Sequence, residues 1–254
     1  MAAISRISTA IVTGGASGLG RATALRLAGR GMGVVVADVR NAEPFEHDNI
    51  IYAETDVTNE MDVTRALDLA RVEFGSCPFV AVNCAGIGYA KRTISSKGDP
   101  HDLDGFARVM NVNAVGTFNV LRLAAMSRMM ETEADEDGQR GVIINTASIA
   151  AYEGQVGQAA YAASKGAIVS MTLPCARDLA VSGVRVCAIA PGLFMTPLLA
   201  GLPELVRTQL ASTVPNPPRL GHAEEYAHLV ESIIDNRMLN GEVIRLDGAL
   251  RMGP

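Results

Sequence analysis

A glycine-rich segment directly after a short apolar run constrains the fold of this chain more than any other feature. The apolar run covers residues 9–13, and Gly14, Gly18 and Gly20 follow it as a segment of helical periodicity begins at Leu19. Glycine allows the tight turn from a strand into a helix, and it lets a pyrophosphate approach the backbone at the helix N-terminus. The spacing Gly-x-x-x-Gly-x-Gly therefore predicts a strand, a turn and a helix that together bind a dinucleotide.

A short apolar run followed by a longer helical segment recurs along the whole chain. This alternation is typical of βα units around a parallel sheet, and the high Val and Ile content indicates strands covered by helices on both faces. Strand candidates cover residues 9–13, 34–37, 50–53, 79–82, 142–144, 184–189 and 243–246. Helix candidates cover residues 19–30, 61–74, 106–130, 159–180 and 223–235. No linker divides them, so we expect a single α/β domain over residues 1–254, a Rossmann-like doubly wound parallel sheet of about seven strands.

Three segments interrupt the alternation. Residues 91–104 are polar and residues 131–140 are acidic, which is typical of surface insertions that leave a sheet intact. Residues 194–220 mix apolar side chains with prolines and follow a strand candidate. Because open α/β sheets bind ligands at the carboxyl ends of their strands, we expect this last segment to be a mobile lid over the substrate.

Charge and composition argue against several classes of partner. The 254 residues carry 22 Lys and Arg against 27 Asp and Glu, a formal net charge of −5, so nucleic acid or an anionic membrane is not expected as the main partner. No apolar run approaches the ~20 residues of a membrane span. The four cysteines and four histidines lack the spacing of a metal site, so no metal is expected. Because the first strand candidate begins within ten residues, we expect a cytoplasmic protein.

A carboxylate at the end of the second strand candidate bears on the choice of cofactor. Asp38 follows Gly18 by 20 residues and can accept hydrogen bonds from ribose hydroxyls. Its charge would repel the 2′-phosphate of NADP, so we expect NAD as the cofactor. The alternative is a glycine-lined helix start that binds no ligand.

Three polar residues after the fifth strand candidate indicate proton transfer. Tyr161 and Lys165 are four residues apart and therefore share one face of a helix. Ser148 lies 13 residues before Tyr161. A nearby ammonium group lowers the pKa of a phenol, so we expect Lys165 to shift Tyr161 toward neutrality. Tyr161 could then take the hydroxyl proton while a hydride leaves an alcohol carbon. The alternative is a surface pair on a helix.

Together with residues 83–86 (NCAG), these motifs resemble the short-chain dehydrogenase/reductase family over residues 9–252. The resemblance implies catalytic roles for Ser148, Tyr161, Lys165 and an asparagine that matches Asn113, with Asn111 as the neighbouring alternative. It implies substrate contacts by Ser148, Gln158 and Tyr161. It implies cofactor contacts by Gly14, Ser17, Gly18, Leu19, Gly20, Asp38, Asp56, Val57, Cys84, Ala85, Gly86, Tyr161, Lys165, Pro191, Gly192, Phe194 and Thr196. On local signals, Asp56 could instead cap the following helix.

Four longer stretches are similar to one branch of the family, which oxidises 3-hydroxyacyl-CoA esters with NAD and also acts on hydroxysteroids. These stretches are residues 141–148, 153–161, 190–194 and 240–249. The resemblance implies a small-molecule substrate, an acyl-CoA ester or a steroid-like alcohol, and a homotetramer. Three alternatives remain: a 3-oxoacyl carrier-protein reductase, which Asp38 argues against, a hydroxysteroid or alcohol dehydrogenase, and a non-catalytic assembly scaffold.

Two sets of residues are candidates for binding the two parts of such a substrate. Leucines of the expected lid, such as Leu199 and Leu205, could line an acyl pocket or pack against the core. Lys91, Arg92 and Lys97 of the first insertion could bind the phosphates of coenzyme A or form a solvated loop face.

Overall fold

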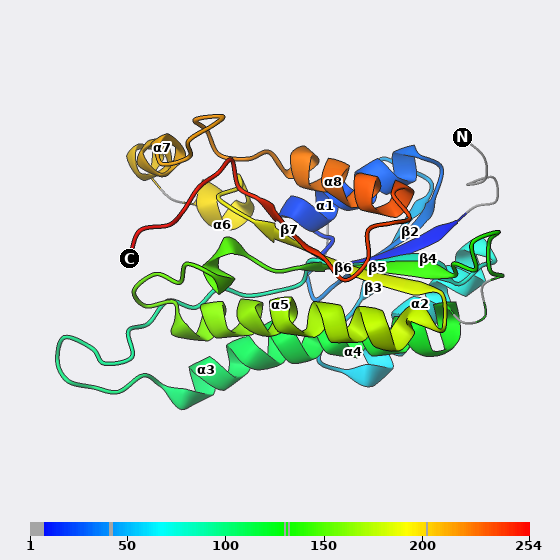
Figure 1. Cartoon of the computed structure of the whole chain (residues 1–254), viewed down its shortest axis with the longest axis horizontal. Coiled ribbons are helices and arrows are strands. Elements are labelled where there is room, and N and C mark those ends of the chain that lie inside the picture. The colour runs from blue at the N-terminus through cyan, green and yellow to red at the C-terminus, as the bar shows by residue number, and fades with distance from the viewer. Residues whose placement is uncertain (1–7, 41–42, 130, 132, 202) are drawn as a thin grey trace.

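The computed structural model describes residues 8–40, 43–129, 131, 133–201 and 203–254 (Figure 1). Its seven strands form one parallel sheet in the order β3-β2-β1-β4-β5-β6-β7, so the chain builds outward from β1 in both directions. The strands are β1 (Thr9–Thr13), β2 (Gly33–Asp38), β3 (Ile50–Glu54), β4 (Pro78–Asn83), β5 (Gly141–Thr146), β6 (Val184–Pro191) and β7 (Val243–Leu246). All seven predicted strands are confirmed, and β1 and β4 flank the point where the strand order reverses, which is where open sheets bind ligands.

Helices cover both faces of the sheet (Figure 1). One face carries α1 (Gly18–Gly29) and α8 (Ala223–Asp235), and the other carries α2 (Glu60–Phe74), α5 (Ala159–Ala180) and the helical run after the first insertion. That run consists of α3 (Leu103–Met110), the π-helical turn η1 (Asn111–Val115), α4 (Gly116–Leu123) and a second π-helical segment, η2 (Ala124–Met129). The doubly wound architecture predicted from the sequence is therefore confirmed.

Alternate residues of each strand serve the two halves of the core. Ala10 and Val12 of β1 pack with α1 and α8, whereas Ile11 between them packs with α2 and α4. Successive side chains of a strand point to opposite faces, so both must be apolar where both faces are covered. The continuous apolar runs in the sequence have this physical cause.

The long helical run starts earlier than predicted. Asp102 is the N-cap of α3, and its Oδ1 accepts a hydrogen bond from Gly105 N at 3.0 Å, so the helix begins at Leu103 and not at residue 106. A carboxylate that satisfies a free first-turn N–H is a standard helix start. The polar character of residues 91–104 concealed this start because the N-cap is itself polar.

The expected lid contains two helices among its described residues. They are α6 (Pro197–Ala200) and α7 (Glu204–Ser212), and they lie on the same side of the sheet as α8 (Figure 1). Residues 1–7, 41–42, Met130, Thr132 and Leu202 lie outside the described part of the chain, although some belong to predicted segments. None of the described helices is long and apolar enough to cross a membrane.

Candidate active site

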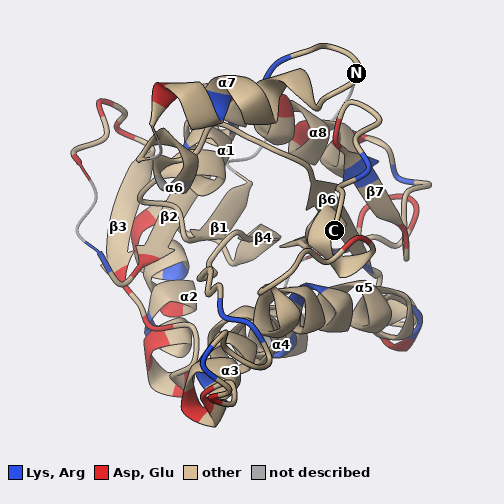
Figure 2. Cartoon of the chain, turned by 90° about the vertical axis from the view of Figure 1, so that its left-hand side faces the viewer, with Lys and Arg blue, Asp and Glu red and all other residues tan. Residues whose placement is uncertain are grey.

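The predicted cofactor and substrate residues gather at the carboxyl ends of the central strands. Figure 2 views this side, with α6 and α7 above the ends of β1 and β4 and with α3 and α4 below them. Residues that are far apart in the sequence therefore face one region of the fold.

The glycine-rich turn lies tightly against the loop that follows β4. Gly14 has a φ of +63°, and a Cβ atom there would lie 2.6 Å from Ala85 N. A Cβ atom on Gly20 would overlap the Gly14 carbonyl oxygen. A side chain at Gly14 would push the turn away from the loop after β4, and a side chain at Gly20 would open the turn itself, so both positions require glycine.

The first turn of α1 presents backbone N–H groups to the same region. Ser17 is the N-cap residue, and its side chain makes no capping hydrogen bond within the described part of the chain. Gly18 follows with a φ of +52°. The start of a helix attracts anions because its first N–H groups have no partner within the helix. The uncapped turn therefore fits a pyrophosphate.

Asp38 has the position that its predicted role requires. Its Oδ2 accepts a hydrogen bond from Ala16 N at 3.0 Å and its Oδ1 accepts one from Arg40 N at 3.1 Å. The Asp38 carbonyl oxygen accepts a further bond from the Tyr52 hydroxyl at 2.8 Å. The carboxylate is fixed beside the glycine-rich turn, and its remaining lone pairs can accept bonds from ribose hydroxyls. The uncapped helix turn and this carboxylate fit a dinucleotide.

Asp56 does not cap the following helix. The N-cap of α2 is Asn59, whereas Asp56 Oδ1 accepts bonds from Thr58 N and Thr58 Oγ1 at 2.9 and 2.7 Å. Val57 is buried, and its carbonyl oxygen accepts a bond from Asn119 Nδ2 at 2.8 Å. Asp56 stays exposed on this tethered loop, so its adenine-side role remains a prediction.

The loop after β4 connects the cofactor side to the candidate reaction centre. Cys84 N donates to Thr13 O at 3.1 Å, and Ala85 N donates to Thr13 Oγ1 at 3.3 Å. Burial raises the pKa of the Cys84 thiol, so the side chain is a neutral packing group. A Cβ atom on Gly86 would lie 3.2 Å from Asn113 Oδ1.

Ser148, Tyr161 and Lys165 converge as predicted. Ser148 is the N-cap of the short helix η3 (Ile149–Ala151), and its side chain hydrogen bonds to Tyr161 on α5. Lys165 Nζ lies 5.7 Å from the centre of the Tyr161 ring and donates to the Thr146 carbonyl oxygen at 2.7 Å. The strand end and the helix therefore bring a hydroxyl, a phenol and an ammonium group together.

The pKa of Tyr161 is shifted in the direction opposite to the one expected. Burial raises it, and the hydrogen bond of Ser148 offsets this only in part. Burial also lowers the pKa of Lys165, to about 8. Both shifts have the same cause, because burial penalises the charged form of each group. Desolvation is therefore the largest influence on the pKa of both groups.

The structure distinguishes Asn113 from Asn111. Asn113 is fully buried in η1, whereas Asn111 is exposed. Asn113 Oδ1 accepts from Ile87 N at 2.8 Å, and its Nδ2 donates to Ile87 O and to Ser164 Oγ, both at 3.0 Å. Asn113 thus links the π-helical turn, the loop after β4 and α5. Its catalytic role remains a prediction.

The lid begins beside the glycine-rich turn. A Cβ atom on Gly18 would lie 3.7 Å from Thr196 Cβ, and Thr196 is the N-cap of α6. Gly192 follows the end of β6, and a Cβ atom there would lie 2.8 Å from Asp247 Cβ. Phe194 is 5% exposed and packs in the core on the α8 side, so its ring faces the core. A contact of Phe194 with a cofactor would therefore involve its backbone.

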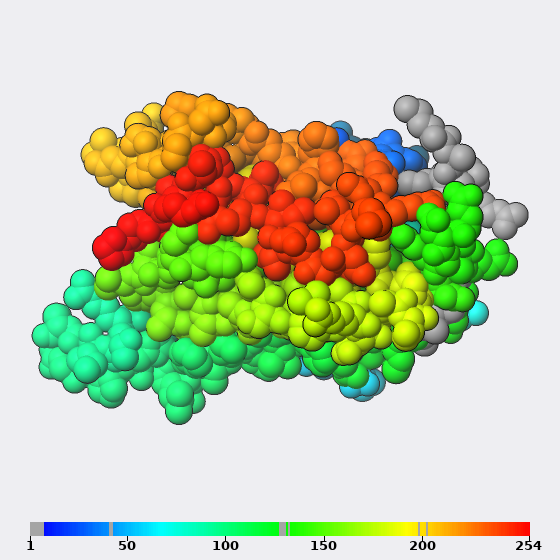
Figure 3. Space-filling view, in the orientation of Figure 1, coloured from blue at the N-terminus to red at the C-terminus, as the bar shows by residue number. Residues whose placement is uncertain are grey.

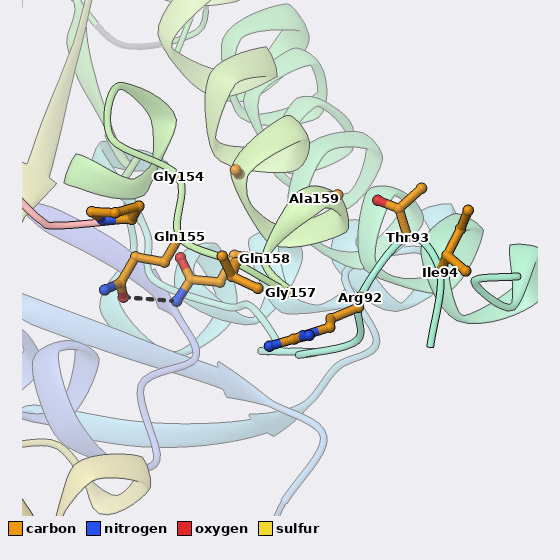
Figure 4. Close-up of a pocket in the computed structure, with 11 residues that line it drawn as sticks. Arg92, Thr93, Ile94, Gly154, Gln155, Gly157, Gln158 and Ala159 are labelled. Carbon is orange, nitrogen blue, oxygen red and sulfur yellow. Dashed lines mark hydrogen bonds between the residues drawn. The ribbon is translucent and has the colours of Figure 1, made fainter. Parts of the chain in front are cut away.

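A groove of about 510 Å³ lies next to the N-terminus of α5 (Figure 4). Gln158 lines it, and Gln158 Oε1 is buried without a hydrogen-bond partner in the described part of the chain. Arg92 of the insertion extends along the groove. Lys91 instead has its Nζ 3.9 Å from Asp102 Oδ2, and Lys97 lies in an exposed turn. Of the three predicted cations, Arg92 lines the groove.

Two residues behind the site, Thr146 and Tyr226, were not predicted from the sequence. Thr146 holds Lys165 through its carbonyl oxygen, and its Oγ1 donates to Asn83 O at 2.6 Å. Tyr226 of α8 is fully buried, and its hydroxyl lies 2.7 Å from Thr146 Oγ1. Thr146 lies between Lys165 on one face of the sheet and Tyr226 on the other. A threonine at a strand end and a tyrosine in an amphipathic helix carry no local signal for this role, because the three residues meet only in the folded chain.

Comparisons with known proteins agree over nearly the whole chain. Residues 8–205 match the family described as short chain dehydrogenase. The chain is 59% identical to the Homo sapiens protein named 3-hydroxyacyl-CoA dehydrogenase type-2, covering 96% of this chain and 95% of that one. It is 55% identical to the Drosophila melanogaster protein of the same name, with coverages of 97% and 98%. The crystal structure of 3-hydroxyacyl-CoA dehydrogenase type-2 from Mycobacterium avium gives a TM-score of 0.91 at 39% identity, with coverages of 98% and 97%.

Proposed function

The chain belongs to the short-chain dehydrogenase family, and from this premise we propose that it is an NAD-dependent dehydrogenase that oxidises a 3-hydroxyacyl-CoA to the 3-oxoacyl-CoA. The observation that carries the proposal is the convergence of Ser148, Tyr161 and Lys165 in a chain so similar to proteins with that name. A buried lysine whose pKa is lowered to about 8, beside a tyrosine and a serine, favours an enzyme over an assembly scaffold.

The chemistry follows from where these side chains lie. NAD, which the glycine-rich turn and Asp38 would hold, would supply an acceptor for the hydride that leaves C3 of the substrate. Ser148 orients the substrate hydroxyl, and the phenolate form of Tyr161, a minor form at neutral pH because burial raises the pKa of the phenol, takes its proton as the carbonyl forms. Lys165, held by the Thr146 carbonyl oxygen, stabilises the phenolate and would donate a hydrogen bond to a ribose hydroxyl of the bound cofactor. In the reverse reaction, the reduction of the 3-oxo group, Tyr161 gives the proton back to the substrate oxygen.

The choice of NAD rests on Asp38. Its carboxylate is held in place by Ala16 N and Arg40 N beside the glycine-rich turn. Ribose hydroxyls can donate to this carboxylate, whereas a 2′-phosphate would bring two negative charges together. Arg40 lies two residues after Asp38 in the sequence, but its contact with the Asp38 carboxylate is made by its backbone N–H.

The substrate assignment can be tested directly with purified protein. In a panel of short, medium-chain and branched 3-hydroxyacyl-CoA esters, we expect oxidation of at least one ester with NAD to exceed oxidation of a 17β-hydroxysteroid control. Initial rates of NADH formation over the whole panel give kcat/KM for each compound. Steroid oxidation that is more efficient than oxidation of every ester would replace the proposed substrate with a hydroxysteroid.

We also propose that the protein is a homotetramer, with a cytoplasmic location as a further prediction. Support for assembly comes from Val115, Phe118 and Met126, which are 54%, 46% and 63% exposed along one side of η1, α4 and η2. Their spacing places them on a common helix face, and exposed apolar stripes of this kind are typical of subunit contacts. A second copy of this chain is the proposed occupant.

A further inference from the structure

An ion-pair cluster links β7 to the segment between Ser148 and Tyr161. Arg245 Nη1 and Nη2 donate to Glu153 Oε1 and Oε2 at 2.8 and 3.0 Å, and Arg245 Nε donates to Asp247 Oδ2 at 2.7 Å. The side chains of Arg245, Glu153 and Asp247 are 23%, 19% and 7% exposed. A two-pronged guanidinium contact is both strong and directional. We call the Arg245 and Glu153 pair the clamp.

The clamp also holds the C-terminal segment. Arg245 Nη2 donates to Leu250 O at 3.0 Å, and Met252 N donates to Glu153 Oε2 at 3.2 Å. Both partners of the pair therefore bind backbone atoms of residues 250–252 in addition to each other. In Figure 3 this segment, in red, runs between the orange lid region and the green region that follows β5.

The segments joined by the clamp form two walls of the groove. One wall is residues 154–159 and another is Pro254. Within the first wall, Glu153 N donates to Ile149 O and Gln158 N donates to Gln155 O, and these local bonds fix the shape of the segment. Its position relative to the rest of the chain depends on longer-range bonds, of which the bidentate pair with Arg245 is charge-assisted.

Two weaker bonds complete the attachment of this wall. Gln155 Nε2 donates to Gly253 O at 3.3 Å, and Lys91 N donates to Gly157 O at 2.8 Å. The first bond depends on the tail that the clamp holds, and the second leads to the insertion that carries Arg92. Loss of the clamp would therefore loosen the two walls together, while the strand end that carries Ser148 would stay in the sheet.

We propose that Arg245 and Glu153 are positioning residues that hold the walls of the substrate groove and so set the affinity for the coenzyme A part of the substrate. The proposal rests on the proposed function for the identity of that substrate. The Arg245 hydrogen bonds lower the pKa of Glu153, so they favour the charged form of the carboxylate that the pair requires. Its effect reaches the substrate through the position of residues 154–159 and Pro254.

The test replaces Glu153 by glutamine, which keeps the size of the side chain and removes its charge. We expect KM for 3-hydroxybutyryl-CoA to rise about tenfold, with kcat and KM for NAD within about twofold, because a contact made equally in the ground and transition states changes KM alone. A thioester of N-acetylcysteamine, which lacks the nucleotide and most of the pantetheine arm, should be oxidised by the variant as by the wild type.

Glu231→Gln is the matched control. The Glu231 side chain is 20% exposed and pairs with Arg26 and Arg30 between α1 and α8, away from the groove. Glu231→Gln should lower thermal stability as Glu153→Gln does, but it should leave KM for the CoA ester unchanged. Hydrogen exchange of residues 153–158 and 248–254 should speed up in Glu153→Gln and not in Glu231→Gln.

Arg245→Lys is a second variant, which keeps the charge but loses the fork, and it should give a smaller rise in KM. Unchanged KM and unchanged exchange in both clamp variants would overturn the proposal, as would an equal rise in KM for both thioesters. If the wild type does not oxidise the CoA ester, the proposed function fails, and the exchange measurement still decides whether the clamp holds the groove walls.

Discussion

At the scale of single residues, Asp38 shows how a side chain is prepared for a ligand. Two backbone N–H groups, those of Ala16 and Arg40, hold its carboxylate at the end of β2. The charge is therefore fixed where a ribose or its phosphate would lie, and it does not need to be ordered when the ligand binds. The selectivity between NAD and NADP should depend on this one charge.

Asp38→Asn tests that dependence, because asparagine keeps the size of the side chain and one of the two acceptor oxygens while it removes the charge. We expect the ratio of kcat/KM for NAD to that for NADP to fall by about 10–100-fold, since removal of the negative charge relieves repulsion of the 2′-phosphate. Steady-state kinetics with both cofactors measures the ratio. A wild type that uses NADP as well as NAD would show that Asp38 does not select the cofactor.

Tyr161→Phe deletes a single hydroxyl and keeps the ring that packs in the site. We expect kcat to fall by about 10²–10⁴-fold, because the group that takes the substrate proton is lost. NADH binding, followed by fluorescence titration, should stay within about twofold of the wild type, since the ring and the glycine-rich turn are unchanged. Near-normal turnover in the variant would remove Tyr161 from the mechanism.

The buried ammonium group of Lys165 makes stability depend on pH. Its pKa is about 8 in the folded protein against 10.5 in the unfolded chain, so between these values the unfolded state binds more protons. Stability of the wild type relative to Lys165→Met should therefore rise with pH from about 8 to about 10.5, by at most about 1.4 kcal/mol per pH unit. Urea denaturation of both proteins across this range gives the difference. A flat or falling difference would contradict the shifted pKa.

At the scale of elements, the insertion after β4 separates the three cations that its sequence groups together. Lys91 lies near Asp102, the N-cap of α3, whereas Arg92 lines the groove and Lys97 lies in an exposed turn. The backbone of this loop, which is tied to Gly157 O through Lys91 N, decides which cation faces the substrate. Of the three cations that lie close together in the sequence, Arg92 alone therefore lines the groove.

Arg92→Ala should raise KM for 3-hydroxybutyryl-CoA by about threefold to tenfold, and the rise should shrink at high salt because an exposed phosphate contact is screened. Turnover at saturation should be unchanged, since the contact is made in the ground and transition states alike. Lys97→Ala is the matched control and should leave KM unchanged. Equal effects of the two substitutions would show that general charge, and not Arg92, attracts the substrate.

At the scale of the whole molecule, the helices on the two faces of the sheet expose different side chains to solvent. Both sides carry ion pairs, such as that of Arg30 with Asp235 on the α1 and α8 side and that of Arg122 with Glu60 between α4 and α2, but the outer side of α4 also exposes Phe118 and its apolar neighbours. Exposed aromatic area without polar cover is costly in water, and a subunit contact removes it. The second face is therefore the one expected to meet another copy.

Phe118→Glu should lower the molar mass measured by light scattering from that of a tetramer to that of a dimer or monomer, because a charge without a partner is costly in an apolar contact. Val72→Glu on α2 is the control, since Val72 is 75% exposed and lies on a different helix. A wild type that elutes as a monomer, or equal dissociation in both variants, would locate no contact on this face.

The sequence by itself determined the seven strands, the main helices and their order along the chain. Seven apolar runs, the glycine-rich turn and the spacing of Tyr161 and Lys165 are local patterns, and strand or helix formation depends on such patterns within a few turns of the chain. The sheet topology then followed from alternation, because parallel strands need helical crossovers of one hand. The positions of Gly14, Gly18 and Asp38 could be predicted for the same reason.

Tertiary structure decided what surrounds those residues. The carbonyl of Thr146 that holds Lys165, the hydroxyl of Tyr226 behind it and the bond from Arg245 to Glu153 join residues from different elements. The raised pKa of Tyr161 also depends on burial, which no spacing records. Local periodicity is encoded by neighbours in the chain, whereas desolvation and long-range contacts arise only after the sheet and its helices have packed.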